Sequence, residues 1–238
     1  MSDARSRWLA NVEATWDERA SWWNEMSSAN AKSVDRAMEL DRIISTLDIN
    51  SSSHVLDAGC GSGQFAIALA VRGMNVVGVD LSPNMIEFAR KNAEMAGVRM
   101  SFIQAEVSCI PIESGSVDAV FARMVLMLTP DPEATLSEFR RALKPGGRLL
   151  VSVPGARSPI FGDAWKLHLR GTPPTMNYMV PWELERLLEH LDWTIIDQWG
   201  DISAAGAEIV VERQVEAWEQ LDRTIKQALA TTWTIVAG

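Results

Sequence analysis

The feature that most constrains the fold of this chain is a short apolar segment followed by three closely spaced glycines. Residues 53–57 are typical of a β-strand, and Gly59, Gly61 and Gly63 follow it at alternate positions. Glycine adopts backbone dihedral angles that other residues avoid, and it lets the backbone approach a ligand closely. Residues 64–72 then have the apolar pattern of a helix, whose first N–H groups lack partners within the helix. A strand, a glycine loop and a helix in this order indicate a ligand site at the carboxyl edge of an α/β sheet.

The alternation of strand and helix continues along the chain. After the first strand, further strands are predicted at residues 75–80, 100–104, 117–121, 148–153, 193–197 and 232–236. Helices are predicted at residues 82–97, 131–143, 164–169, 183–191 and 207–229. Alternating strands and helices are typical of a mostly parallel sheet with helices on both faces, so we expect an α/β fold.

Local signals predict several helix ends. Ser82 provides an N-cap and Pro83 suits the first position of a helix. The helices before Gly73 and Gly97 are expected to end there, because glycine favours the left-handed conformation of a helix C-cap. Asp131 precedes a proline in the same way and is predicted to begin a helix.

Charge and cysteine content narrow the classes of function. The net charge of −9 and the lack of a basic run argue against a nucleic-acid partner. Cys60 and Cys109 are the two cysteines, too few for a disulfide framework or a four-cysteine zinc site, so we expect no metal and a reducing compartment. No apolar run approaches the roughly 20 residues of a membrane span, and residues 1–8 lack a secretory signal. We therefore expect a cytoplasmic protein that binds small molecules.

An acidic residue after the second strand points to a nucleoside. Asp80 lies 17 residues after Gly63, where a carboxylate can accept hydrogen bonds from both hydroxyls of a ribose. The structural alternative for Asp80 is to cap the next helix, a role that Ser82 already fills. The glycines follow the pattern G-x-G-x-G and not the G-x-G-x-x-G of dinucleotide sites, which disfavours NAD.

Five segments resemble motifs of the class I S-adenosylmethionine (SAM)-dependent methyltransferases, of the small-molecule type that includes ubiquinone and menaquinone biosynthesis enzymes. The segments are residues 55–63, 76–80, 102–111, 116–120 and 139–147. The resemblance implies a Rossmann-like sheet of seven mostly parallel strands with the last strand antiparallel. It also implies one domain over residues 1–238, with an N-terminal helical lid (1–50), a SAM-binding core (51–153), and a substrate-loop region with the last two strands (154–238).

The resemblance also implies roles for single residues. Asp57 and Gly59 would face the methionine portion of SAM, Asp80 the ribose, and Glu106 with Val107 the adenine. Gly61, Gly63, Leu81, Arg123 and Trp22 complete the expected cofactor contacts. The family usually has Gly-Asp where this chain has Ala105-Glu106, so the carboxylate that would reach the adenine is longer.

The tryptophans of the N-terminal segment admit two interpretations. Residues 16–23 resemble an aromatic and acidic segment that closes over the cofactor in related enzymes. An aromatic face stabilises a sulfonium cation, so Trp22 or Trp23 could lie near the methyl group. Packing in the core is the structural alternative for both side chains.

The methyl acceptor is expected to bind in an apolar pocket built from Met124, Met127, Leu128 and residues 176–179. His168 and Tyr178 are the candidate general bases, because both lie in the segment after the fifth strand where substrate loops occur. We predict methyl transfer from SAM to a small apolar or aromatic metabolite by a monomer or homodimer. The alternatives are a SAM-binding regulatory protein without turnover and, third, an NAD-dependent oxidoreductase.

Overall fold

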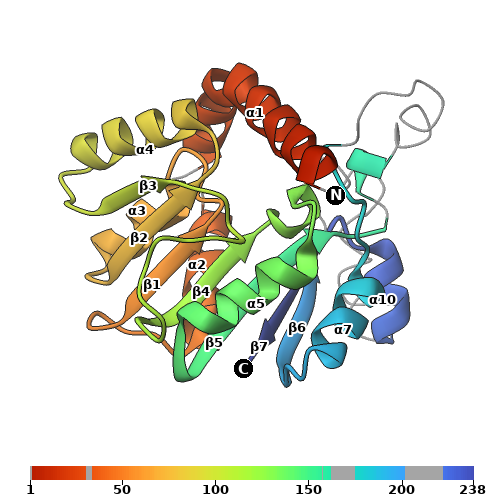
Figure 1. Cartoon of the computed structure of the whole chain (residues 1–238). Coiled ribbons are helices and arrows are strands. Elements are labelled where there is room, and N and C mark those ends of the chain that lie inside the picture. The colour runs from red at the N-terminus through yellow and green to blue at the C-terminus, as the bar shows by residue number, and fades with distance from the viewer. Residues whose placement is uncertain (1, 31–33, 157, 162–174, 202–221) are drawn as a thin grey trace.

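A seven-stranded sheet forms the centre of the protein (Figure 1). The structure is a computed structural model, and it describes residues 2–30, 34–156, 158–161, 175–201 and 222–238. The strand order is β3-β2-β1-β4-β5-β7-β6. The strands are β1 (His54–Ala58), β2 (Asn75–Asp80), β3 (Ser101–Gln104), β4 (Val117–Arg123), β5 (Leu143–Pro154), β6 (Ile195–Asp201) and β7 (Thr232–Ala237).

Strand direction agrees with the predicted α/β fold. The first five strands run parallel to one another, and β7 runs antiparallel to both of its neighbours, β5 and β6. The prediction of a mostly parallel sheet with an antiparallel last strand is therefore confirmed. Strand β1 pairs with β2 on one side and with β4 on the other. The chain changes direction across the sheet at this point, and crevices for ligands form at such switch points.

Helices cover both faces of the sheet. The structure describes α1 (Ser2–Asn30), α2 (Val34–Leu47), α3 (Gln64–Val71), α4 (Pro83–Met95), α5 (Pro132–Ala142), α7 (Pro181–His190) and α10 (Arg223–Leu229), with 3₁₀ helices η1 (Leu126–Leu128) and η2 (Pro159–Phe161). One buried cluster joins α2, α3 and α4 to the sheet, and a second joins α5 and α7 to the opposite face.

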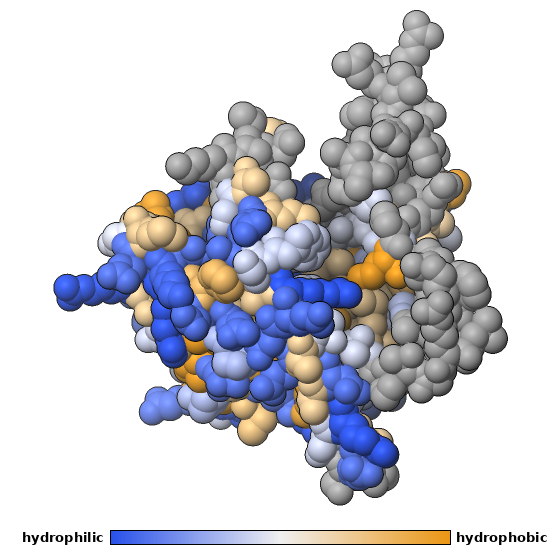
Figure 2. All heavy atoms as spheres, turned by 90° about the horizontal axis from the view of Figure 1, so that it is seen from above, coloured by the Kyte–Doolittle hydropathy of each residue, from blue (hydrophilic) through white to orange (hydrophobic). Residues whose placement is uncertain are grey.

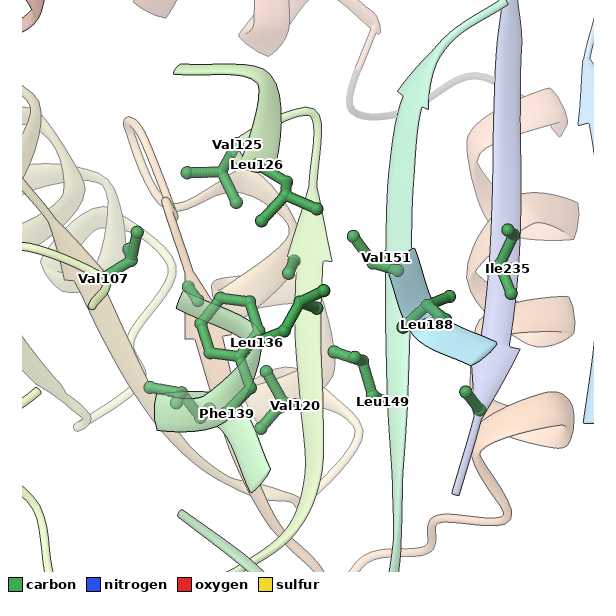
Figure 3. Close-up of a cluster of buried hydrophobic side chains, with 14 of the residues drawn as sticks. Val107, Val120, Val125, Leu126, Leu136, Phe139, Leu149, Val151, Leu188 and Ile235 are labelled. Carbon is green, nitrogen blue, oxygen red and sulfur yellow. The ribbon is translucent and has the colours of Figure 1, made fainter. Parts of the chain in front are cut away.

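Neighbouring residues of a strand belong alternately to the two clusters. Val120 of β4 belongs to the cluster with α5, whereas its neighbour Phe121 belongs to the cluster with α3. Successive strand side chains point to opposite faces, so an unbroken apolar strand supplies both cores. Figure 3 shows the cluster that includes α5 and α7, with Leu136 and Phe139 of α5 lying close to Val120 and Leu149.

The predicted helix starts are confirmed by their side-chain caps. Ser82 Oγ accepts a hydrogen bond from the backbone N–H of Met85 at 3.1 Å, and Asp131 Oδ1 accepts one from Ala134 at 2.9 Å. Gly73 and Gly97 follow their helices with positive φ angles of 93° and 70°. These four residues predict the helix ends correctly because each satisfies backbone groups that have no partner within the helix, or allows the chain to turn away from it.

Two strands begin two or more residues away from the position that the sequence predicted. Strand β5 begins at Leu143 and not at residue 148, because Leu143 already pairs with Val117 before the ladder resumes at Arg148. Strand β6 begins at Ile195 and not at residue 193, because the N–H of Trp193 donates to Leu188 O at the end of α7. The predicted helix at residues 164–169 and most of the one at 207–229 lie outside the described residues.

Helix α1 crosses the upper end of the sheet in Figure 1, above the carboxyl ends of the central strands. Seen from that side in Figure 2, the surface is mainly hydrophilic, with apolar residues in small groups. Among the helices that the structure describes, none is both long enough and apolar enough to cross a bilayer.

Candidate active site

A cavity of about 350 Å³ lies between α1 and the carboxyl ends of four strands. Its floor comes from residues at or just after the ends of β3, β2, β1 and β4, which are Glu106, Asp80, Gly59 and Arg123 respectively. This is the edge of the sheet where α/β proteins bind ligands. A separate hollow of about 550 Å³ lies beside the end of α4 and the edge strand β3, away from these carboxyl ends.

The glycine loop forms a close-fitting cradle in the cavity floor. Gly59 has a φ of 75°, and its N–H donates to Val79 O at 2.7 Å. A methyl group on Gly59 would lie 2.5 Å from Val125 Cγ2, and one on Gly61 would lie 3.2 Å from Trp23 Nε1. The absence of side chains at these two positions therefore lets the loop pack closely against Val125 and Trp23 at the cavity floor.

Asp80 connects the cradle to the start of α4. Its carboxylate accepts hydrogen bonds from the N–H groups of Gly61 at 2.9 Å and Ser82 at 3.0 Å. Burial raises the pKa of Asp80, although these backbone donors act in the opposite direction. Because a carboxylate can accept about four hydrogen bonds, Asp80 keeps capacity for a ligand that enters the cavity.

Asp57 lies beneath the cradle and not in the cavity wall. Only 3% of it is exposed, and the backbone N–H of Ala66 donates a hydrogen bond to it. Burial, and then the negative charge of Asp80, raise the pKa of Asp57 to about 7. Asp57 therefore lies below the glycine loop as a buried carboxyl group that holds a proton more readily than a free aspartate does.

The raised pKa of Asp57 predicts a pH dependence of stability. Folded Asp57 holds a proton between about pH 4 and 7, where the unfolded chain has released it, so this group lowers the stability of the fold as pH rises through that range. We expect the difference in unfolding free energy between Asp57→Asn and the wild type to increase in favour of the variant by roughly a few kcal/mol from pH 5 to pH 8. Urea unfolding of both proteins at the two pH values measures the difference. A difference that does not change with pH would contradict the raised pKa.

Glu106 is held by the first turns of α1. Its carboxylate pairs with Arg5 and accepts a hydrogen bond from Ser108 Oγ at 2.6 Å. Arg5 also donates to Ser108 Oγ at 2.8 Å. Val107, the next residue, is buried and lines the cavity beside Glu106. The side chain of Glu106 is only partly engaged, because its second oxygen has no hydrogen bond to a described residue.

Helix α1 supplies the roof of the cavity with one face. The residues that line the cavity from this helix are Leu9, Val12, Glu13, Trp16, Arg19 and Trp23. The rings of Trp16 and Trp23 meet edge to face with centroids 5.6 Å apart. Trp22, in contrast, is 54% exposed and does not line the cavity. Trp23 therefore takes the position beside the glycine loop that the sequence left open between the two tryptophans.

Hydrogen bonds fix α1 at both ends of the cavity. Trp8 Nε1 donates to Leu128 O at 2.8 Å, and Asn92 Nδ2 donates to Asn24 Oδ1 at 2.8 Å. Asp17 accepts a hydrogen bond from the N–H of Asn84 at 3.1 Å, at the first turn of α4. The roof is thus fastened to η1 on one side and to α4 on the other.

Arg123, at the end of β4, faces the cavity beside Met124. Its Nε donates to Glu39 Oε1 of α2 at 3.1 Å, and its guanidinium carbon lies 5.2 Å from the centre of the Phe65 ring. An arginine in this position brings a positive charge to the end of the cavity opposite Glu106.

The part of the cavity beyond Arg123 is mainly apolar. It is lined by Met124, Val125, Met127, Leu128, Thr129, Ile160, Met176 and Thr232. The expected pocket residues Met124, Met127, Leu128 and Met176 are thus brought together, whereas Met179 packs against the core. Asn177 fixes this region, since its Nδ2 donates to Leu126 O at 2.9 Å and to Thr129 O at 3.1 Å.

The structure describes one of the two candidate general bases, Tyr178. Tyr178 is partly buried, its ring centre lies 6.0 Å from that of Phe161, and burial raises its pKa. It is absent from the residues that line the cavity. His168 lies outside the described residues. Within those residues, no cluster of three or more His, Cys, Asp or Glu side chains could hold a metal ion.

Most of the cofactor residues expected from the sequence meet in this one cavity. Those that line it are Gly59, Gly61, Asp80, Leu81, Glu106, Val107 and Arg123. Asp57 and Gly63 lie behind the loop, where a methyl group on Gly63 would meet Ala89 and Phe102. The roof also includes Leu9, Val12, Glu13 and Arg19, which were not predicted from the sequence. The seven-residue spacing of Leu9, Trp16 and Trp23 could have indicated this face of α1.

Comparisons with known proteins agree with this geometry. The family described as "Methyltransferase domain" matches residues 56–151. A ubiquinone biosynthesis O-methyltransferase of Xylella fastidiosa is 30% identical over 177 residues, covering 71% of this chain and 72% of the relative. A demethylmenaquinone methyltransferase of Thermus thermophilus is 30% identical over 152 residues, covering 63% of this chain and 64% of the relative.

Solved structures share the fold. A SAM-dependent methyltransferase from Aquifex aeolicus matches with a TM-score of 0.59 at 16% identity, covering 83% of this chain and 88% of that one. The cyclase SpnF matches with a TM-score of 0.69 at 18% identity, covering 95% of this chain and 94% of that one. The sequence relationship to the O-methyltransferase, together with the cavity, identifies the family. The chain belongs to the class I SAM-dependent methyltransferases, and SAM is its cofactor.

Proposed function

We propose that SAM lies along the cavity floor in the order of the strands. Adenine would lie between Leu81 and Val107 with its amino group toward Glu106, the ribose against Asp80, and the methionine portion past Gly59 toward Arg123. Three observations support this orientation: the glycine loop that exposes backbone at the cavity floor, the unused acceptor capacity of Asp80 and Glu106, and the positive charge of Arg123 at the other end.

We further propose that the acceptor is a small apolar or aromatic metabolite. The observation that carries this proposal is the mainly apolar end of the cavity beyond Arg123, where the flexible side chains of Met124, Met127 and Met176 can adapt to a flat or bulky ligand. The relatives are named for ubiquinone and menaquinone biosynthesis, and the first of them is an O-methyltransferase. A hydroxylated aromatic compound is therefore the first acceptor class to test.

The mechanism requires little covalent chemistry from the protein. When bound, SAM supplies an electrophilic methyl group on its sulfonium sulfur. The roof formed by α1 covers the cavity floor, which would limit the access of water to a bound cofactor, and Trp16 and Trp23 offer aromatic faces to a cation. The apolar wall around Met127 and Met176 would hold the acceptor for in-line attack, which converts binding energy into orientation.

Incubation with methyl-labelled SAM tests the acceptor class. The acceptors offered are catechol, 1,4-naphthalenediol and, as a polar control, glycine. We expect label in a hydroxylated aromatic product and none in glycine, because the apolar wall offers no partner for an ammonium and a carboxylate. Label only in the polar acceptor would contradict the proposal. Calorimetric titration with S-adenosylhomocysteine and with NAD separately checks that the site prefers the SAM product over the dinucleotide.

The acidic net charge and the two cysteines support a cytoplasmic enzyme that works on small molecules. We propose this cytoplasmic location, and we also propose that residues 1–238 form a single domain.

A further inference from the structure

A carboxylate of α2 bridges two guanidinium groups behind the cavity. Glu39 Oε1 accepts a hydrogen bond from Arg123 Nε at 3.1 Å, and its Oε2 lies 3.7 Å from Arg36 Nε. Both guanidinium groups lie over the same ring, since their central carbons are 4.1 Å (Arg36) and 5.2 Å (Arg123) from the centre of Phe65. The negative charge of Glu39 offsets the repulsion between these two positive charges.

Glu39 binds the Nε side of the Arg123 guanidinium. Glu39 engages Nε, and the two terminal nitrogens of Arg123 have no hydrogen bond to any described residue. A guanidinium presents its terminal N–H groups as a fork that matches a carboxylate through two parallel hydrogen bonds. Because Arg123 also lines the cavity, the bond at Nε and the Phe65 ring fix the plane of the fork at the cavity floor.

The position of Arg123 selects the part of SAM that it meets. Strand β4 lies three strands from β3 in the sheet order, which corresponds to about 14 Å at about 4.8 Å per strand. Glu106 follows β3, and Asp80 ends β2, so an adenosine bound there directs the amino-acid end of SAM toward β4. That end carries a carboxylate, and Arg123 is the cation at this side of the described cavity floor.

We propose that Glu39 is a positioning residue that orients the Arg123 fork toward the carboxylate of the methionine portion of SAM. Glu39 itself does not line the cavity and acts through Arg123. The proposal rests on the orientation of SAM given above. It assigns to α2 a role in cofactor selection in addition to its packing on the sheet.

Titration with SAM and with decarboxylated SAM, which lacks only the carboxylate, tests this role. In the wild type we expect SAM to bind about tenfold more tightly or better than the decarboxylated compound. Glu39→Gln is expected to reduce this preference several-fold by weakening SAM alone, and Arg123→Gln to abolish it. Glu39→Asp, which keeps the charge on a shorter side chain, is expected to restore part of the preference. Arg123→Lys keeps the positive charge but loses the two parallel N–H donors, so it is also expected to reduce the preference for SAM. This variant replaces Glu39→Gln in the test if Glu39→Gln does not fold.

Asp41→Asn is the matched control. Asp41 is an exposed carboxylate of the same helix that pairs with Arg72 at 3.3 Å, so its loss should leave the preference unchanged. If Glu39→Gln weakens both compounds equally, or leaves the preference intact, the positioning role is overturned and Glu39 is a packing residue. Failure of the proposed orientation has a different signature, because a wrong assignment of Asp80 would make Asp80→Ala weaken S-adenosylhomocysteine and its 2′,3′-dideoxy analogue by the same factor.

Discussion

Gly59→Ala is expected to destabilise the protein by about 2–5 kcal/mol and to weaken S-adenosylhomocysteine binding by more than about 100-fold. Two effects combine at this position. The φ of 75° strains any residue with a Cβ atom, and that atom would lie 2.5 Å from Val125 Cγ2. Since Val125 is buried in the core and lines the cavity, it cannot yield without reshaping the floor. Urea unfolding and calorimetric titration measure the two losses.

Gly97→Ala separates strain from contact. Gly97 has a similar φ of 70°, but a methyl group there would meet no atom within 4 Å. We expect this variant to lose about 1–2 kcal/mol of stability and to bind S-adenosylhomocysteine as the wild type does. Equal losses in the two variants would show that contact with Val125 contributes nothing, and the cradle would then not determine ligand binding.

Asp80→Ala is expected to weaken S-adenosylhomocysteine binding by about 1.5–3 kcal/mol, or roughly 10- to 150-fold. The variant loses the carboxylate that we assign to the ribose, and it also frees the N–H groups of Gly61 and Ser82 that this carboxylate holds. A single affinity measurement therefore combines the loss of the ribose contact with the loss of the hydrogen bonds that hold the loop.

A double-mutant cycle with the ligand separates them. Titration of wild type and Asp80→Ala with S-adenosylhomocysteine and with its 2′,3′-dideoxy analogue gives four affinities. If Asp80 holds the ribose hydroxyls, the wild type discriminates between the two ligands and the variant does not. If Asp80 only fastens the loop, the substitution weakens both ligands by the same factor, and Asp80 is then removed from the ligand site.

The sequence was sufficient for most of the fold because its signals are local. An apolar strand shows itself by composition, and the ends of α4 and α5 by Ser82 and Asp131, whose side chains bond to N–H groups three residues on. The start of β5 was predicted five residues late because pairing between Leu143 and Val117 depends on a partner strand that periodicity does not reveal. The length of a strand therefore depends on the strand that it pairs with, and not on its own sequence alone.

The site was predictable where residues follow a strand end and not where helices pack from elsewhere. Gly59, Asp80, Glu106 and Arg123 follow four strands that meet at one edge, so topology alone brings them together. Trp22 was expected in the site and is exposed, because the choice between adjacent tryptophans depends on the rotation of α1. A pair such as Glu39 and Arg123, separated by 84 positions, carries no sequence signal that a single chain could show.

Helix α1 gives the enzyme a modular construction. It supplies the roof of the cavity, yet it lies wholly before the residues 56–151 that match the family pattern. Substitutions at Leu9, Val12, Trp16 or Arg19 can alter the shape and charge of the roof while the cradle, Asp80 and Arg123 stay unchanged. A library of substitutions on the cavity-facing side of α1 can therefore redirect this enzyme to new acceptors. The residues assigned to the cofactor are left unchanged in such a library.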